Sequence, residues 1–450
     1  MNSSPLFKMS NTSKTELDLQ LDLLVVDVQS IDQTVTSVVD VDNSLPPVDG
    51  GFHALAYLTS AWVVELLVWS YPFSYGVFLE HYKTHVFPEA PSSILALVGS
   101  MSTGVIYITS WIVLPLISRY PALKKPLMAV GVVLVVAALI GAAFATQPWQ
   151  LVLTQGAIYG LGSSLLYYPT MTYLFEWFSK RKGLANGIMF SGTGVGGVVV
   201  PIIVEVLLRK YGHRMTLISL AVAFAVLIIP AFPYMKPRLP ASKIAPPPMD
   251  ISFMRSSAFW ILFIANFFQG LPAYVPTLYL PSFAADTDLS DAAGSLTLSV
   301  LNGASVPGLI FLGWLSDRFD LRISIVVSGL GSALTVFLLW GLSKSLPQLM
   351  VFSFVYGFLG ASWSALWPRF IASIVGDDPR LSSFVLTAFI GGRGIGNVAS
   401  GPVSTVILHP WVLTDQTSFA YGVKGYGPLI LFLGLMLLLS TTGIMYRSFR

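Results

Sequence analysis

The chain consists largely of apolar blocks of twenty or more residues, separated by short polar or charged stretches. A helix of that length crosses about 30 Å of hydrocarbon, so the pattern predicts an integral membrane protein. The blocks form two sets of six. They cover residues 54–79, 93–118, 126–145, 149–174, 184–208 and 214–235, and then 258–283, 292–315, 323–342, 347–373, 382–407 and 426–446. We therefore expect an all-α fold of twelve transmembrane helices in two six-helix bundles.

Two stretches interrupt this pattern and set the predicted domain boundaries. Residues 236–257 are proline-rich and basic, which is typical of a linker, here between a bundle at 50–235 and a bundle at 258–450. Residues 1–49 carry eight acidic and two basic residues and contain no apolar run long enough to span a membrane. We expect this acidic tail to be disordered, and we expect no signal peptide in it.

The distribution of Lys and Arg predicts the orientation of the chain. With both termini in the cytosol, 17 of the 25 basic residues fall in the tails and the cytosolic loops and six fall in the outer loops. This asymmetry follows the positive-inside rule. We expect a multi-pass protein with cytosolic termini, in the plasma membrane or in an internal membrane such as that of the vacuole.

Composition removes several classes of function. Only 10% of the residues are charged, against about 25% in soluble domains, and the scattered net charge of +3 does not favour nucleic-acid binding. The absence of cysteine excludes disulfides and thiolate chemistry. We expect no metal site from the five histidines, no cofactor and no enzymatic activity, because no nucleophile–base pair or phosphate loop is apparent.

The two halves of the chain resemble each other. "SGTGVGG" from residue 191 matches "GGRGIGN" from residue 391, and "SRYPALKK" from residue 118 matches "DRFDLR" from residue 317. Both pairs keep an offset of 199 or 200 residues. An internal repeat with one constant offset is typical of secondary transporters and predicts two bundles related by pseudo-two-fold symmetry.

The first of these glycine-rich segments contains G-x-G-x-x-G, which is also a dinucleotide-binding pattern. A dinucleotide site requires a preceding strand and an acidic residue about 20 positions later, and neither is present. Glycines four residues apart inside a span instead predict close approach of two helix backbones. We assign this helix-packing role to Gly183, Gly187, Gly192, Gly196, Gly392 and Gly396.

Four segments resemble parts of a known family. Residues 49–78 and 173–197 are similar to the two signature segments of the monocarboxylate transporter family, and "GWLSDRFDLR" at 313–322 resembles the loop motif of the major facilitator superfamily. "LNGAS" at 301–305 is similar to fungal-type members of the family. The resemblance spans roughly residues 49–447 and implies the major facilitator fold, in which two bundles enclose a cavity that opens alternately to each side without ATP.

The resemblance also assigns roles to residues. It implies that the cytoplasmic loop residues Arg119, Lys180, Arg181, Asp317 and Arg318 hold one conformation of the bundles. Proton-coupled members carry a lysine in helix one and an Asp/Arg pair in helix eight, but the matching positions here are Phe73, Ser305 and Leu309. Proton–monocarboxylate symport therefore does not carry over. A serine that lines the substrate path in helix ten matches Ser364.

Charged residues inside the spans give the strongest indication of a site, because each is costly unless it faces protein or water. Arg393 lies in the middle of the eleventh block, followed at helical spacing by Asn397, Ser400 and Ser404. A guanidinium suits a carboxylate, so we predict an anion-binding role for Arg393. The alternative is a structural ion pair or a clamp on backbone carbonyls.

Glu65 lies in the middle of the first block. It could pair with Arg393, carry a proton, or act as a static partner for another polar group. Candidate residues of the cavity wall are the aromatic residues Phe73, Trp363 and Trp367 together with Ser364, Asn302 and Asn397. For Asn302, a contact between two helices is an equal alternative.

Together these patterns predict a secondary active or facilitative transporter. Its solute is expected to be a small organic molecule, a monocarboxylate or another organic anion, with a co-transported proton as a candidate partner. We expect the lipid bilayer, but no obligate protein partner, around it. The alternatives are a facilitator or exporter of a neutral or aromatic metabolite, and a receptor that binds a solute without moving it.

Overall fold

The structure is a computed structural model that describes residues 46–179, 181–238, 251–287, 289–290, 292–376, 379–408, 421–422 and 425–446. Within these residues all regular structure is helical. The acidic tail up to residue 45, Lys180 and most of the linker lie outside the described residues.

The helices of the first half follow the apolar blocks. They are α2 (Gly51–His81), which ends in the π-turn η1 (Tyr82–Val86), α3 (Ser92–Ile108), α4 (Ser110–Arg119), η2 (Pro121–Leu123), α5 (Lys124–Ala143), α6 (Pro148–Leu151), η3 (Val152–Ile158), α7 (Tyr159–Trp177), α8 (Lys182–Ala231) and η4 (Phe232–Tyr234). Inside α8, Gly212 has a φ of 72°, which only glycine adopts readily, so the chain reverses there and α8 is two helices joined at a kink.

The second half repeats this arrangement. Its helices are η5 (Ser252–Arg255), α9 (Ser257–Ala273), α10 (Val275–Asp286), α11 (Ala293–Arg318), α12 (Leu321–Leu334), η6 (Thr335–Trp340), α13 (Leu346–Leu359), η7 (Trp363–Leu366), α14 (Trp367–Val375), α15 (Pro379–Ile407), α16 (Gly427–Ser440) and η9 (Thr441–Met445). Pro272 and Pro276 flank the break between α9 and α10, as expected from the missing amide protons of proline.

Nine helical segments of the described chain are long and apolar enough to cross a membrane. One of them, Leu184–Tyr234, contains the kink at Gly212. The continuous helical stretch from α6 to α7 and the helix α15 are not among the nine. Helix α15 carries the polar stripe of Arg393, Asn397, Ser400 and Ser404, which lowers its hydropathy.

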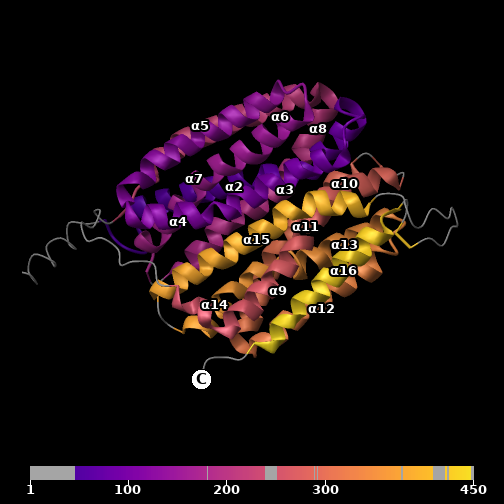
Figure 1. The fold of residues 1–450 in the computed structure, drawn as a ribbon. Coiled ribbons are helices and arrows are strands. Elements are labelled where there is room, and N and C mark those ends of the chain that lie inside the picture. The colour runs from indigo at the N-terminus through magenta and orange to yellow at the C-terminus, as the bar shows by residue number, and fades with distance from the viewer. Residues whose placement is uncertain are drawn as a thin grey trace, which may run out of the picture.

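Figure 1 shows the helices α2–α8 grouped on one side and the helices α9–α16 grouped on the other. Where the groups meet, α3 packs along α15, α8 along α11 and α2 along α10. We call the end of the bundle near the connection 87–91 and the end of α10 the distal end, and the opposite end, near Gly51 and Tyr446, the terminal end.

The repeated glycines of α8 and α15 make equivalent contacts in the two halves, both within a half and between the halves. A Cβ at Gly192 or Gly196 would meet the backbone of α2, and a Cβ at Gly396 would meet the backbone of α9. Gly194 faces Val306 of α11, while its counterpart Gly394 faces Ile108 of α3. Each glycine helix therefore packs on a helix of its own half and on a helix of the other half.

The remaining packing glycines differ from one another. Gly392 lies against the ring of Phe263. Gly187, which we expected in a helix contact, meets no atom within 4 Å, so it does not pack against a neighbouring helix in this conformation. Gly183 lies near the start of α8.

Several contacts toward the distal end join the two halves. The Tyr274 hydroxyl donates to the carbonyl oxygen of Pro72, and Ser299 Oγ donates to the carbonyl oxygen of Val198 over 2.7 Å. A Cβ at Gly76 would overlap the Thr277 carbonyl oxygen and press on the ring of Pro281. Helix α2 thus reaches α10 only because residue 76 has no side chain.

We predict that Gly76→Val opens the distal end. Overpacking typically costs 1–3 kcal/mol, so labelling of a cysteine placed at the buried position 282 by a membrane-impermeant maleimide should accelerate about fivefold or more. The chain has no cysteine of its own, so Ser282→Cys provides a single reporter. The matched control is Gly187→Val, which adds the same side chain in open space and should not accelerate labelling. Equal rates in both variants would contradict the role of Gly76.

Candidate functional site

Arg393 lies in the middle of α15 and is 7% exposed. Its Nη1 donates to Gln269 Oε1 of α9, and its guanidinium lies 6.0 Å from the ring of Trp367. The phenol of Tyr107, on α3 of the other half, also interacts with the guanidinium. Arg393 therefore lies where α15, α9 and α3 meet.

A network of neutral groups fixes these partners. Helix α13 ends at Leu359, so the carbonyl oxygen of Gly360 has no helical partner and accepts from Gln269 Nε2 over 2.8 Å. On the preceding turn of α9, Asn266 Oδ1 accepts from both indoles, at 3.2 Å from Trp363 and 2.9 Å from Trp367. The indole that stands beside Arg393 is thus held in place by Asn266.

The charge of Arg393 is not balanced by an acidic side chain in the described part of the protein. Its contacts are an amide, a phenol and an indole face. An ion pair joins Lys124 to Glu176, which lies near the end of α7. A buried guanidinium without a counter-ion is costly, and an anionic solute would remove that cost.

Glu65 is buried in the middle of α2 and has a different partner from the one considered above. Its Oε2 accepts a hydrogen bond of 2.7 Å from Thr193 Oγ1 of α8, while its Oε1 is buried without a partner. One turn earlier, Trp62 Nε1 donates to Ser191 Oγ over 3.0 Å. Glu65 therefore bonds to α8, and one of its oxygens is left without a donor.

The two charged residues occupy related positions. Thr193 and Arg393 are 200 residues apart in the repeat, and each bonds to the first helix of its own half, Thr193 to Glu65 and Arg393 to Gln269. The contact between α2 and α8, which we call the first seam, carries a carboxylate. The contact between α9 and α15, which we call the second seam, carries a guanidinium. The phenol of Tyr107 is close enough to interact electrostatically with both Glu65 and Arg393.

Two asparagines join the halves at equally related positions. Asn302 Nδ2 of α11 donates to the carbonyl oxygen of Gly197 over 2.9 Å, and Asn397 Nδ2 of α15 lies 3.4 Å from Thr103 Oγ1 of α3. Asn302 thus makes the helix–helix contact that was the alternative to a cavity role. Asn397 Oδ1 is buried without a partner.

The other candidates for the cavity wall lie on α2, η7 and α14. Phe73 is half-buried, with its ring 5.7 Å from that of Trp69. Ser364 lies in the turn η7 and is half-buried, whereas Trp363 is fully buried and packs its ring 5.7 Å from Phe370. Trp363 is therefore packed inside the second half, and Trp367 is the indole next to Arg393.

The loop residues lie away from this site. Asp317 and Arg318 end α11 and are exposed, and Arg119 ends α4 and is exposed. The backbone amide of Arg181 donates to Asp49 Oδ1 over 2.9 Å. Lys180 lies outside the described residues. Arg369 is exposed near the start of α14.

Sequence reasoning missed Gln269, Asn266 and Tyr107. Gln269 and Asn266 are fully buried, on one face of α9, three residues apart. Their position inside an apolar block was a usable signal. An amide side chain in a membrane span needs a hydrogen-bond partner, so it faces another helix, as a charged side chain does. Nothing in the sequence alone indicates Tyr107, since its position beside Arg393 depends on how α3 packs against α15.

Comparison with known proteins gives the family. The model for the Major Facilitator Superfamily matches residues 54–285 and again residues 262–445. The two matches overlap at residues 262–285.

Several fungal proteins are similar over most of the chain. MFS transporter asaE of Aspergillus flavus is 26% identical over 370 residues, which cover 80% of this chain and 81% of that protein. The aspyridones efflux protein apdF of Emericella nidulans is 24% identical over 428 residues, which cover 93% of this chain and 85% of that protein. The fujikurins efflux protein of Gibberella fujikuroi is 29% identical, over 64% of this chain and 62% of that protein.

Solved structures show the same fold. The nucleoside transporter NupG superposes with a TM-score of 0.70 at 13% identity, covering 86% of this chain and 99% of that structure. The peptide transporter POT superposes with a TM-score of 0.65 at 14% identity, covering 85% of this chain and 93% of that structure. With family matches that together span residues 54–445, the chain belongs to the Major Facilitator Superfamily.

Proposed function

We propose that this transporter exports an amphipathic organic acid by alternating access. The observation that carries the proposal is the buried Arg393, which has neutral partners and no acidic one in the described part of the protein. An acidic group on the solute would supply the missing counter-ion and would bind the guanidinium through two parallel hydrogen bonds.

The surroundings of Arg393 favour a solute with an apolar or aromatic body. Trp367, Tyr107 and the nearby Trp69 provide large ring surfaces, with Trp69 and Tyr107 5.3 Å apart. The relatives named as efflux proteins for fujikurins and aspyridones support export as the direction and a metabolite as the solute. The solute class is thus broader than the monocarboxylates that the family resemblance implies.

We further propose that Glu65 carries the coupling proton. The positions matching the proton-coupling lysine and Asp/Arg pair of monocarboxylate transporters are Phe73, Ser305 and Leu309, none of which titrates. Glu65 has one oxygen bonded to Thr193 and one without a partner, so it can accept a proton and remain inside the bundle. Glu65 and Arg393 occupy equivalent seams in the two halves. A movement of the halves relative to each other would therefore change the surroundings of both residues.

The proposed topology has twelve spans with both termini in the cytosol of the plasma membrane. Division of the nine candidate spans at Gly212 gives ten, and the stretch 148–177 and α15 complete twelve. In this orientation the packed distal end is the outer side, so the conformation is closed toward the outside. Residues 50–235 and 258–450 form the two bundles, joined by the linker.

The competing function is movement of a neutral or aromatic metabolite, with Arg393 acting only as a clamp. The bond from Arg393 to Gln269 favours it, because that bond joins α15 to α9 through an uncharged side chain. A receptor that binds without transport is the remaining alternative. It differs by giving saturable binding without flux.

The test uses proteoliposomes loaded with aromatic carboxylic acids or with the corresponding methyl esters and amides. Export of the acids, in preference to both neutral forms, is the expected result. Equal export of acids and amides would contradict the proposed anion site and favour the clamp. Binding without export would favour the receptor.

A further inference from the structure

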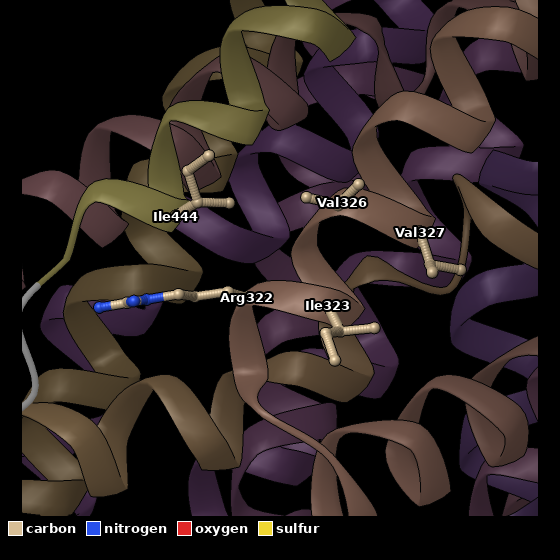
Figure 2. Close-up of a pocket in the computed structure, with 5 residues that line it drawn as sticks. All are labelled: Arg322, Ile323, Val326, Val327 and Ile444. Carbon is tan, nitrogen blue, oxygen red and sulfur yellow. The ribbon is translucent and has the colours of Figure 1, made fainter.

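A second feature of the protein lies outside the central site. Helix α12 and the turn η9 border a hollow of about 400 Å³ that opens to the outside of the bundle at the terminal end. Its lining residues are Arg322, Ile323, Val326, Val327 and Ile444. In Figure 2, Ile444 and Val326 approach each other from the two helices, and Arg322 extends past them at one side.

The walls of this hollow are apolar and accessible. Ile323 is 46% exposed and Ile444 is 40% exposed, and Val326 and Val327 are half-buried. They lie at the start of α12 and at the end of η9, where two spans meet the boundary of the membrane. A groove of this kind in a span is bordered by lipid chains rather than by water.

Arg322 places a positive charge at one end of this hollow, which we call the groove. Its Nη2 donates to the carbonyl oxygen of Tyr446 over 3.1 Å, and its guanidinium lies 5.5 Å from the ring of Tyr446, so the side chain is held in place. The neighbouring Asp320 accepts from the backbone amide of Arg322 as the cap of α12. No ion pair joins Arg322 to an acidic group in the described residues, and four of its five N–H donors are not used by the Tyr446 bond.

We propose that this groove binds one anionic glycerophospholipid, with its phosphate on Arg322 and an acyl chain between α12 and η9. Basic pockets between membrane helices recognise anionic headgroups, and a guanidinium matches a phosphate through paired hydrogen bonds. The fixed guanidinium at one end and the apolar walls beyond it fit a headgroup and a chain in that order. The proposal requires only that the protein spans a membrane, and it does not depend on the transported solute.

The test uses the full chain in proteoliposomes with phosphatidylserine or phosphatidylcholine that carries a photoreactive diazirine on the acyl chain. Peptide mapping after illumination reports crosslinks to the segments that contain Ile323 and Ile444. We expect about fivefold more crosslinking from phosphatidylserine, because one basic residue near the headgroup contributes a preference of that order.

Two variants and one control separate headgroup from chain. Arg322→Gln should remove the preference for phosphatidylserine, and Val326→Trp should reduce crosslinking from both lipids by filling the groove. Arg255→Gln removes an exposed charge outside the lining of the groove and should change neither result. A preference that survives Arg322→Gln would overturn the proposal. Loss of the phosphatidylserine signal in excess inorganic phosphate would assign the site to a soluble anion and would also overturn it.

Discussion

Replacement of Arg393 by glutamine is expected to lower the transport efficiency for an organic acid by about 30-fold or more. Truncation of one partner of a buried, hydrogen-bonded charge pair costs 2–5 kcal/mol, and each 1.4 kcal/mol is a factor of ten. Glutamine keeps an amide that can reach Gln269 but lacks the charge. The measurement is the initial rate of export from loaded proteoliposomes as a function of acid concentration, for protein that remains monodisperse in detergent.

The design includes two comparisons. Arg393→Lys keeps the charge but loses the planar fork, so an intermediate rate is expected. Arg369→Gln removes an exposed arginine near the start of α14 and should leave the rate unchanged. The methyl ester, which has no charge to pair, should be exported equally by the wild type and by Arg393→Gln. An acid rate that is unaffected by Arg393→Gln would make Arg393 a structural clamp.

Replacement of Glu65 by glutamine is expected to remove the response of export to a proton gradient. In the wild type, acidification outside the loaded vesicles should speed export, since a proton enters as the acid leaves. Glutamine keeps the shape of the side chain and can still accept from Thr193, but it cannot take up a proton. If Glu65 is the proton carrier, export by the variant no longer depends on the gradient. The ratio of the export rates with and without the gradient should therefore fall to about one.

The matched control is Glu205→Gln in the same proteoliposomes. Glu205 is a half-buried carboxyl on α8, twelve residues beyond Thr193 and outside the candidate site. It should leave the gradient response intact, which separates the loss of any carboxyl from the loss of Glu65. If Glu65→Gln keeps the full response, Glu65 is a static partner of Thr193 and the proton travels elsewhere.

Much of the fold could be predicted from the sequence, because a lipid environment leaves few choices for an apolar block. Blocks of twenty apolar residues became helices, and the repeated glycines became contacts between backbones. One expected contact, that of Gly187, is missing. Gly187 meets no neighbour because the packing of a glycine depends on the helix opposite, which its own spacing does not specify.

The candidate site was less predictable than the fold. The sequence identifies Arg393 and Glu65 because a charge in an apolar block is conspicuous, but it does not identify the partner of either residue. The structure pairs them with Gln269 and Thr193 instead of with each other, and this pairing follows from which helices cross at the seams. The proximity of two of the five histidines was also missed. His81 and His85 lie one turn apart with stacked rings 4.8 Å apart, although the described residues contain no group of three ligands suited to a metal ion.

The contacts of Gly194 with Val306 and of Gly394 with Ile108 have a mechanical consequence. Both lie near the middle of their helices, so each crossing can serve as the fulcrum of a lever whose arms reach the two membrane surfaces. At 1.5 Å per residue, the start of α8 lies about 18 Å from Gly194, and a tilt of about 10° would move it by about 3 Å. A side chain at either glycine would push the two crossing helices apart and would hinder this tilt. In such a movement, Gly194 and Gly394 would keep the crossing helices at their short separation.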